Sequence, residues 1–127
     1  MSRSDEFLKS FFDQDIYFLG SRSLQQSAWQ YAQGDLQFGS CLLRSFEDWS
    51  TILEHREEFN LSDKQIKQIQ QLFDMLDYFQ ETNDFPNTPS QYHALLQNSE
   101  WIKIQNYAHH LYTSVGSELN VNLGWRV

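Results

Sequence analysis

Residues 61–81 read LSDKQIKQIQQLFDMLDYFQE, and this stretch decides the fold expected for the chain. Ser62 and Gln65 have capping-box spacing, and Leu61 and Ile66 stand where a hydrophobic staple has its two apolar residues. Apolar residues then recur at helical spacing on one face: Ile66, Ile69, Leu72, Phe73, Leu76 and Phe79. Acidic residues gather on a flank beside that face: Asp63, Asp74, Asp77 and Glu81. The pattern predicts a helix with one buried stripe and one acidic stripe.

The N-terminal part of the chain predicts a short aromatic helix. Ser4 has the position of an N-cap, and an apolar edge follows it, made of Phe7, Leu8, Phe11 and Phe12. We expect this helix to stop near residues 13–15. Residues 16–19 (IYFL) then read either as a short strand or as a buried continuation, because so short an apolar run has no decisive period.

Four further helices are predicted from capping residues and apolar spacing. They begin at Ser23, Ser45, Thr88 and Ser99, and the first, second and fourth end near Gly34, Asn60 and Gly116. The short link before residue 61 makes the second of these an antiparallel neighbour of the helix at residues 61–81.

Two stretches alternate apolar and polar residues as strands do, residues 35–43 (DLQFGSCLL) and the tail 117–127 (SELNVNLGWRV). The second reads as a strand, whereas two adjacent leucines break the alternation of the first. The expected fold class is therefore mainly α, a bundle of five or six helices with room for a small two- or three-stranded β element. A chain of 127 residues predicts a single domain, residues 1–127.

Composition and charge narrow the classes of partner. The formal net charge of −8 argues against nucleic acid, since phosphate binding needs a basic face, but it suits a basic protein partner. The single cysteine, Cys41, excludes an intramolecular disulfide and fits a reducing cytoplasm. The start MSRSDEF does not resemble a signal peptide, and no window has the apolar length of a membrane span. We therefore expect a cytoplasmic protein that does not enter the membrane.

The sequence does not supply a complete set of catalytic or metal-binding residues. His109 and His110 are adjacent and point about 100° apart on a helix, and His55 and His93 stand alone except for Glu58 near His55. Paired carboxylates at Asp13 and Asp15 could act as acid and base or bind a divalent ion, but capping of the following loop is the commoner case. Cys41 lies in an apolar context typical of an inert thiol. The sequence predicts no catalytic residues, no metal and no cofactor.

Acidic residues on two neighbouring predicted helices are the remaining candidates for function. A solvated face is the ordinary interpretation of such residues. The sharper interpretation is a docking surface for a basic partner, with an aromatic anchor among carboxylates. The predicted contact residues are Glu54, Glu57, Glu58, Asp74, Asp77, Tyr78 and Glu81.

Residues 11–20 (FFDQDIYFLG) resemble the opening of some immunity proteins of bacterial contact-dependent growth inhibition systems, in which a short aromatic helix precedes an F-x-Q-D or similar step. Phe12, Gln14 and Asp15 match that step, and Asp13 stands where His or Asn is more usual. The resemblance implies a small, acidic, cytoplasmic protein that neutralises a cognate toxin by direct binding, commonly over the toxin's active site. It carries no catalytic residues to this chain.

The favoured hypothesis is therefore a protein-binding inhibitor, an immunity protein for a bacterial toxin that is itself basic. One alternative is a small metal-dependent hydrolase using Asp13, Asp15 and a histidine. Another is an acidic phage-type or regulatory inhibitor, although nine basic residues dilute the acidic array that mimicry of nucleic acid needs. Exposed aromatic residues would serve a homodimer as readily as a foreign partner.

Overall fold

The structure is a computed structural model, and it describes residues 3–31, 38–83 and 89–123. Every regular element in these ranges is helical. The elements are α1 (Arg3–Ser10), η1 (Phe11–Ile16), α2 (Tyr17–Leu19), α3 (Arg22–Tyr31), α4 (Phe38–Glu54), α5 (Asp63–Thr82), α6 (Pro89–Gln97) and α7 (Ser99–Leu123). Because α1, η1 and α2 follow one another without a break, the described residues form six helices. The predicted mainly helical class is confirmed.

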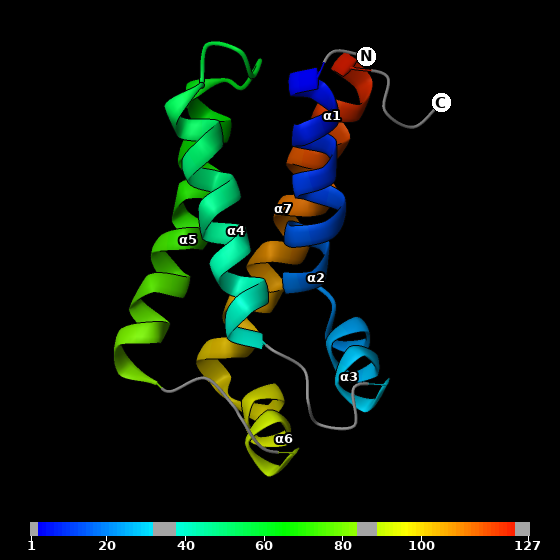
Figure 1. The fold of residues 1–127 in the computed structure, drawn as a ribbon, viewed down its shortest axis with the longest axis vertical. Helices are drawn as coiled ribbons and strands as arrows, with labels where there is room; N and C mark the ends of the chain where they lie inside the picture. The colour runs from blue at the N-terminus through cyan, green and yellow to red at the C-terminus, as the bar shows by residue number, and fades with distance from the viewer. Residues whose placement is uncertain (1–2, 32–37, 84–88, 124–127) are drawn as a thin grey trace.

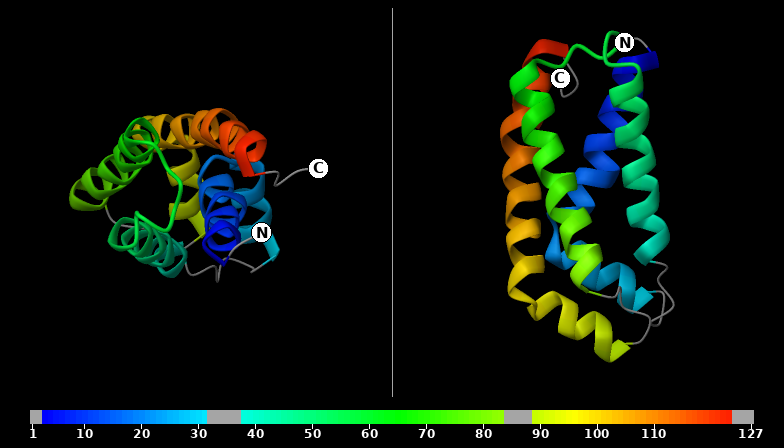
Figure 2. Two further views of the ribbon diagram at one scale, coloured as in Figure 1. Left: turned by 90° about the horizontal axis from the view of Figure 1, so that it is seen from above. Right: turned by 90° about the vertical axis from the view of Figure 1, so that its left-hand side faces the viewer.

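The long helices α4, α5 and α7 run along the molecule beside the continuous α1–η1–α2 segment (Figure 1). Seen from above, α7 packs against both α5 and this N-terminal segment (Figure 2). The shorter helices α3 and α6 lie together at one end of the bundle. There the Arg22 guanidinium donates a hydrogen bond to the Leu96 carbonyl oxygen at 2.8 Å. α7 is thus the helix that joins the N-terminal segment to α5.

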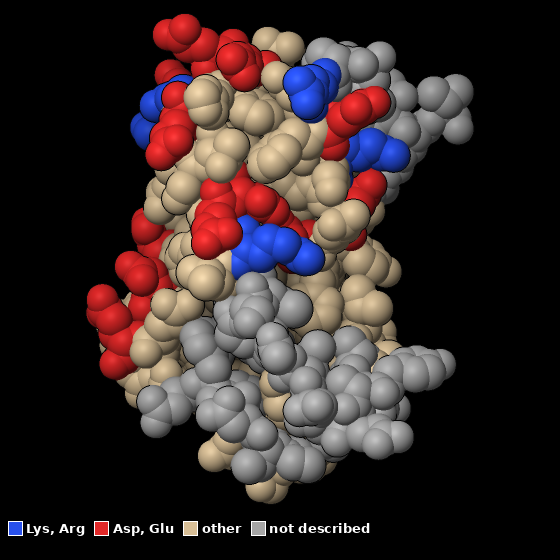
Figure 3. All heavy atoms as spheres, viewed as in Figure 1, with Lys and Arg blue, Asp and Glu red and all other residues tan. Residues whose placement is uncertain are grey.

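α5 forms as its sequence indicates. Ser62 Oγ accepts a hydrogen bond from the Gln65 amide at 3.1 Å, and Gln65 Oε1 accepts one from the Ser62 amide at 2.9 Å, so the capping box is present. The buried stripe consists of Ile69, Leu72, Phe73, Leu76 and Phe79. Leu61 and Ile66 pack against the edge of the core. Acidic side chains occupy the outer edge of the molecule along this helix (Figure 3).

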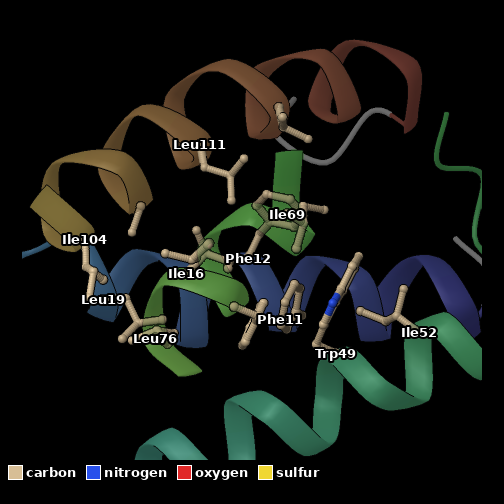
Figure 4. Close-up of a cluster of buried hydrophobic side chains, with 14 of the residues drawn as sticks. Phe11, Phe12, Ile16, Leu19, Trp49, Ile52, Ile69, Leu76, Ile104 and Leu111 are labelled. Carbon is tan, nitrogen blue, oxygen red and sulfur yellow. The ribbon is translucent and has the colours of Figure 1, made fainter. Parts of the chain in front are cut away.

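Aromatic rings fill the space between α4, α5 and η1 (Figure 4). The Phe73 ring is stacked 5.9 Å from Trp49 and 6.0 Å from Phe11, measured between ring centroids. Trp49 Nε1 donates to Gln70 Oε1 at 2.8 Å, which satisfies the one polar atom of the indole. These side chains hold together two antiparallel helices whose backbones diverge (Figure 1).

The N-terminal helix does not stop near residues 13–15, so that prediction is wrong. Residues 11–16 widen into a π-helical turn, and the helix continues to Leu19. Phe11, Phe12 and Ile16 are all buried, so the continuation keeps three apolar side chains in the core. Of the two alternatives for residues 16–19, the buried continuation is therefore correct.

Gly20 ends this segment where the chain crosses α7. A Cβ atom at Gly20 would lie 2.6 Å from the backbone nitrogen of His109 and 2.8 Å from its Cα. Only a residue without a side chain permits this approach of two backbones. Gln25 Nε2 then donates to the carbonyl oxygens of Phe18 and Leu19, at 2.8 and 3.0 Å. These hydrogen bonds satisfy carbonyl groups that have no partner within the helix at its C-terminal end.

The described residues contain no β-strand, and the expectation of a strand in the tail is wrong. Residues 117–123 continue α7, and residues 124–127 lie outside the described residues. Gly116 does not end the helix. It is buried, and a Cβ atom there would meet Phe12 at 3.9 Å. Leu119 follows Val115 at helical spacing and is 1% exposed, so burial of the apolar stripe outweighs the weak helix propensity of glycine.

The start of α4 also differs from the expectation. α4 begins at Phe38 rather than at Ser45, so residues 38–43 are helical, while residues 35–37 lie outside the described residues. Ser45 is buried at 3% exposure inside the helix. A run that alternates over only a few residues therefore did not distinguish a strand from the first turns of a helix.

Several predicted helix ends are displaced by a few residues. α4 ends at Glu54 rather than at Asn60, and residues 55–58 form a turn. Asn98, and not Ser99, caps α7, because its Oδ1 accepts from the amides of Glu100 and Trp101 at 2.9 and 3.1 Å. The predicted cap at Thr88 lies outside the described residues. Polar residues adjacent in sequence compete for one cap, and the backbone path decides between them.

Candidate partner-binding surface

The predicted contact residues form two separate groups, because α4 and α5 run in opposite directions. Glu54, Glu57 and Glu58 lie at the end of α4 and in the turn that follows it. The second group lies in the C-terminal half of α5 and consists of Asp74, Asp77, Tyr78 and Glu81. Asp77 is fourteen residues beyond Asp63, the start of α5, which corresponds to about 21 Å along a helix axis. The two groups therefore do not make one compact patch.

The α5 group, Asp74, Asp77, Tyr78 and Glu81, is exposed throughout. Tyr78 is the most exposed large apolar side chain among the described residues, at 61% of its surface. Asp74 Oδ1 accepts a hydrogen bond from Gln70 Nε2 at 2.9 Å, one turn earlier on the same helix. The phenol and the carboxylates are spaced three and four residues apart, so they share one solvent-facing side of α5.

A groove of about 430 Å³ adjoins this group, between α5 and the first turns of α7. Its apolar wall comes from Met75, Tyr78 and Phe79 of α5 and from Ile104 of α7. Phe79 and Ile104 are 1% and 2% exposed, so they belong to the core and form a firm floor. Met75 is half-buried and Tyr78 stands out at the edge. The volume is within the range of pockets that hold small ligands or anchoring side chains, roughly 300–1,000 Å³.

Polar and charged side chains form the rim of the groove. α5 supplies Gln71 and Asp74, and α7 supplies Glu100 and Lys103. All four are exposed. Two carboxylates from different helices thus face the groove together with one ammonium group. The rim has a net negative charge, and Asp77 and Glu81 extend that charge along α5.

Sequence reasoning identified Asp74 and Tyr78 but missed Glu100, Lys103 and Met75. The spacing of Asp74 and Tyr78, four residues apart, placed them on one side of a helix. No local pattern indicates that α5 packs on α7, where the Tyr107 hydroxyl donates to the Gln68 carbonyl oxygen at 2.7 Å. The groove is a product of that long-range packing.

Asp15, one of the residues of the alternative hydrolase hypothesis, lies in the core. Its side chain is 1% exposed, and Arg44 Nη2 donates to its Oδ1 at 3.0 Å. Burial, followed by the hydrogen bond and negative charge of Asp48, raises the pKa of Asp15 from 3.8 to about 7, against the opposing effect of Arg44. When both groups are carboxylates neither can donate, and Asp15 Oδ2 lacks a partner among the described residues. The raised pKa of Asp15 favours its protonated form, which can act as a hydrogen-bond donor.

Asp13 does not join Asp15 in a site. It lies 4.0 Å from the Lys9 ammonium group, and its Oδ1 accepts a hydrogen bond from the Tyr112 hydroxyl of α7 at 3.3 Å. Asp15 instead pairs with Arg44 of α4. The π-helical turn therefore directs the two carboxylates toward different helices.

The histidines lie apart from one another, and all four are exposed. His93 is within 3.1 Å of Gln97 on α6. His109 lines a second hollow of about 420 Å³ beside Tyr17, Gly20 and Arg22. Within the described ranges, no three or more His, Cys, Asp or Glu side chains are placed to hold a metal ion. Cys41 is part of α4, but its side chain is outside what the structure describes.

Comparisons with known proteins identify no relative: no family model, no curated protein and no solved structure matches this chain. Across residues 3–31, 38–83 and 89–123, no helix has both the length and the apolar character required to cross a membrane.

Proposed function

We propose that this protein is a protein-binding inhibitor, an immunity protein that neutralises a basic cognate bacterial toxin by direct contact in the cytoplasm. The observation that carries the proposal is the setting of Tyr78. This aromatic side chain is 61% exposed, stands at the edge of a groove and has Asp74, Asp77 and Glu81 on the same helix. The resemblance of residues 11–20 to immunity proteins supports the same class.

The physical chemistry of association favours this arrangement. Exposed tyrosines in a partly apolar hollow are frequent energetic anchors of protein interfaces, because they bury a large area with few rotatable bonds. Carboxylates around the anchor attract a basic partner over a distance and orient it before contact. The net charge of −8 acts in the same direction.

Two of the three residues that match the immunity-protein step, Phe12 and Asp15, are internal, whereas Gln14 is exposed. Phe12 and Asp15 are 1% and 2% exposed, and both lie in the π-helical turn. They would shape the scaffold, while α5 would present the contact residues. The alternative hydrolase has weaker support, since its two carboxylates contact different partners and Asp15 is enclosed.

The test is rescue of growth by the protein in cells that express a candidate toxin encoded by a gene next to its own. We expect co-expression of the wild-type chain to restore growth and the double substitution Asp74→Lys with Asp77→Lys to abolish the rescue. Binding measured in parallel should weaken by at least ~10-fold and become less dependent on salt, because attractive charge has been replaced by repulsion.

The matched control is the double substitution Glu57→Lys with Glu58→Lys, which makes the same charge change at the other end of α5. It should preserve rescue. Equal loss in both variants would indicate a response to net charge alone. Unchanged affinity in the Asp74 and Asp77 variant would show that this surface is not the interface, and gel filtration of the protein alone would then test a homodimer.

A further inference from the structure

We infer that the groove between α5 and α7 binds an arginine side chain presented by the partner, flanked by apolar residues. This inference rests on the proposed function and names the chemistry of the partner at the same surface. A side chain that binds in this groove must contact both apolar and acidic residues. Arginine has both an apolar stem and a charged, planar end.

The apolar part of the groove suits the methylene stem. Ile104 and Phe79 close the floor, and Met75 lies half-buried beside them. Methionine adapts its shape to an entering chain because its thioether is flexible and polarizable. Burial of the stem removes apolar surface from water on both sides of the interface.

The edge of the groove suits the guanidinium group. Tyr78 offers an exposed ring face on which a flat cation can stack. Asp74 on α5 and Glu100 on α7 supply carboxylates from the two opposite sides. A guanidinium can donate to carboxylates in two directions while its face rests on a ring, which an ammonium group cannot do.

Among the described residues that line the groove, Lys103 is the one basic side chain. It favours a cation held toward Asp74 and Tyr78 rather than toward the middle of α7. The acidic residues nearby on α5, Asp77 and Glu81, reinforce this direction. Charge complementarity therefore selects a basic anchor and also indicates the side of the groove that it occupies.

The experiment is an NMR titration of the isolated full chain, labelled with ¹⁵N, with the tripeptide acetyl-Leu-Arg-Leu-amide at low salt. The matched probe replaces arginine with citrulline, which has the same shape without the charge. We expect saturable shifts at the amides of residues 71–79 and 100–104, and affinity for the citrulline peptide lower by roughly five-fold.

Two variants localise the contact. Tyr78→Ala should reduce the affinity for the arginine peptide several-fold, and Asp74→Asn should reduce it and remove much of the difference between arginine and citrulline. Tyr17→Ala is the control, since Tyr17 is another exposed tyrosine, at 43%, on the opposite flank of α7. It should leave the titration unchanged.

Equal affinity for the two peptides, or shifts centred on Glu57 and Glu58, would overturn the inference. This failure is distinct from failure of the proposed function. If the peptide does not bind but Asp74→Lys with Asp77→Lys still abolishes rescue from the toxin, the inhibitor function is supported and the arginine anchor is rejected. If the peptide binds as expected but no toxin is neutralised, the arginine site is supported and the proposed function is rejected.

Discussion

α7 meets the N-terminal segment and α5 in different ways. On the N-terminal side, Gly20 brings two backbones so close that even a methyl group would collide with His109. On the α5 side, the helices separate toward the end of α5 and leave a groove of about 430 Å³. The same helix therefore has one flank closed by packing and one flank left open to solvent.

Carboxylates have opposite environments in the N-terminal segment and at the groove. Asp15 is buried, Arg44 pairs with it, and the neighbouring Asp48 raises its pKa. Asp74 and Glu100 are exposed at the groove. A buried acid that pairs with Arg44 acts within the fold, whereas exposed acids beside an apolar hollow remain available to a partner. Asp15 therefore has a structural role, and Asp74 and Glu100 are the acids that can serve binding.

The largest expected effect concerns Asp15 and pH. Because the pKa of Asp15 rises from 3.8 to about 7 on folding, the folded protein retains a proton that the unfolded chain releases between these values. The stabilisation is complete below pH 3.8 and is lost as the pH rises through about 7. We expect the free energy of unfolding to fall by up to ~4 kcal/mol over this range from this group alone.

Urea denaturation at several pH values measures this effect. Asp15→Asn cannot titrate, so its stability should fall less steeply than that of the wild type between pH 4 and 7. Asp77→Asn, which removes an exposed carboxylate, should keep the wild-type slope. Parallel profiles for the wild type and Asp15→Asn would contradict the raised pKa of Asp15.

The closed flank should not tolerate a side chain at position 20. Gly20→Ala places a methyl carbon 2.6 Å from a backbone atom, which a side-chain rotation cannot relieve. We expect a loss of ~3 kcal/mol in the free energy of unfolding as α7 and the N-terminal segment are forced apart. Thermal and urea unfolding measure this loss.

Gly116→Ala is the matched control for that substitution. The added carbon would meet the Phe12 ring at 3.9 Å, an ordinary contact, and alanine is the better helix former. This variant should be unchanged or more stable by up to ~1 kcal/mol. Similar destabilisation by both substitutions would mean that the approach at Gly20 is not special.

The well-formed start of α5 should be sensitive to its cap. Ser62→Ala removes the hydroxyl that accepts from the Gln65 amide, and we expect a loss of ~1 kcal/mol. Hydrogen exchange should show faster opening in the first turns of α5 than around the groove. Ser99→Ala is the control, because Asn98 caps α7, and it should change stability by less than ~0.5 kcal/mol.

The open flank should show the smallest effect on stability. Asp74→Asn and Tyr78→Ala alter exposed side chains, so each should change the free energy of unfolding by less than ~0.5 kcal/mol. Denaturation curves beside the peptide titration would separate folding from binding. A loss above ~1 kcal/mol at Tyr78 would make it a packing residue and erase the contrast between the two flanks.

The sequence by itself determined the helices and their buried faces. The stripe of α5 and its capping box follow from local spacing, because a helix places residues three and four apart on one side. The same spacing put Asp74 and Tyr78 together. The predicted strand in the tail was wrong, because an alternating pattern over a few residues also fits the continuation of an amphipathic helix.

Only the tertiary structure decided which faces meet. Glu100 and Lys103 join Asp74 at one groove because α5 packs on α7, and no local pattern predicts contact between helices separated by α6. The same applies to Asp15, which is buried in the π-helical turn beside Arg44 of α4. Burial of a charge depends on what the rest of the chain places around it, and that information is not carried by neighbouring residues.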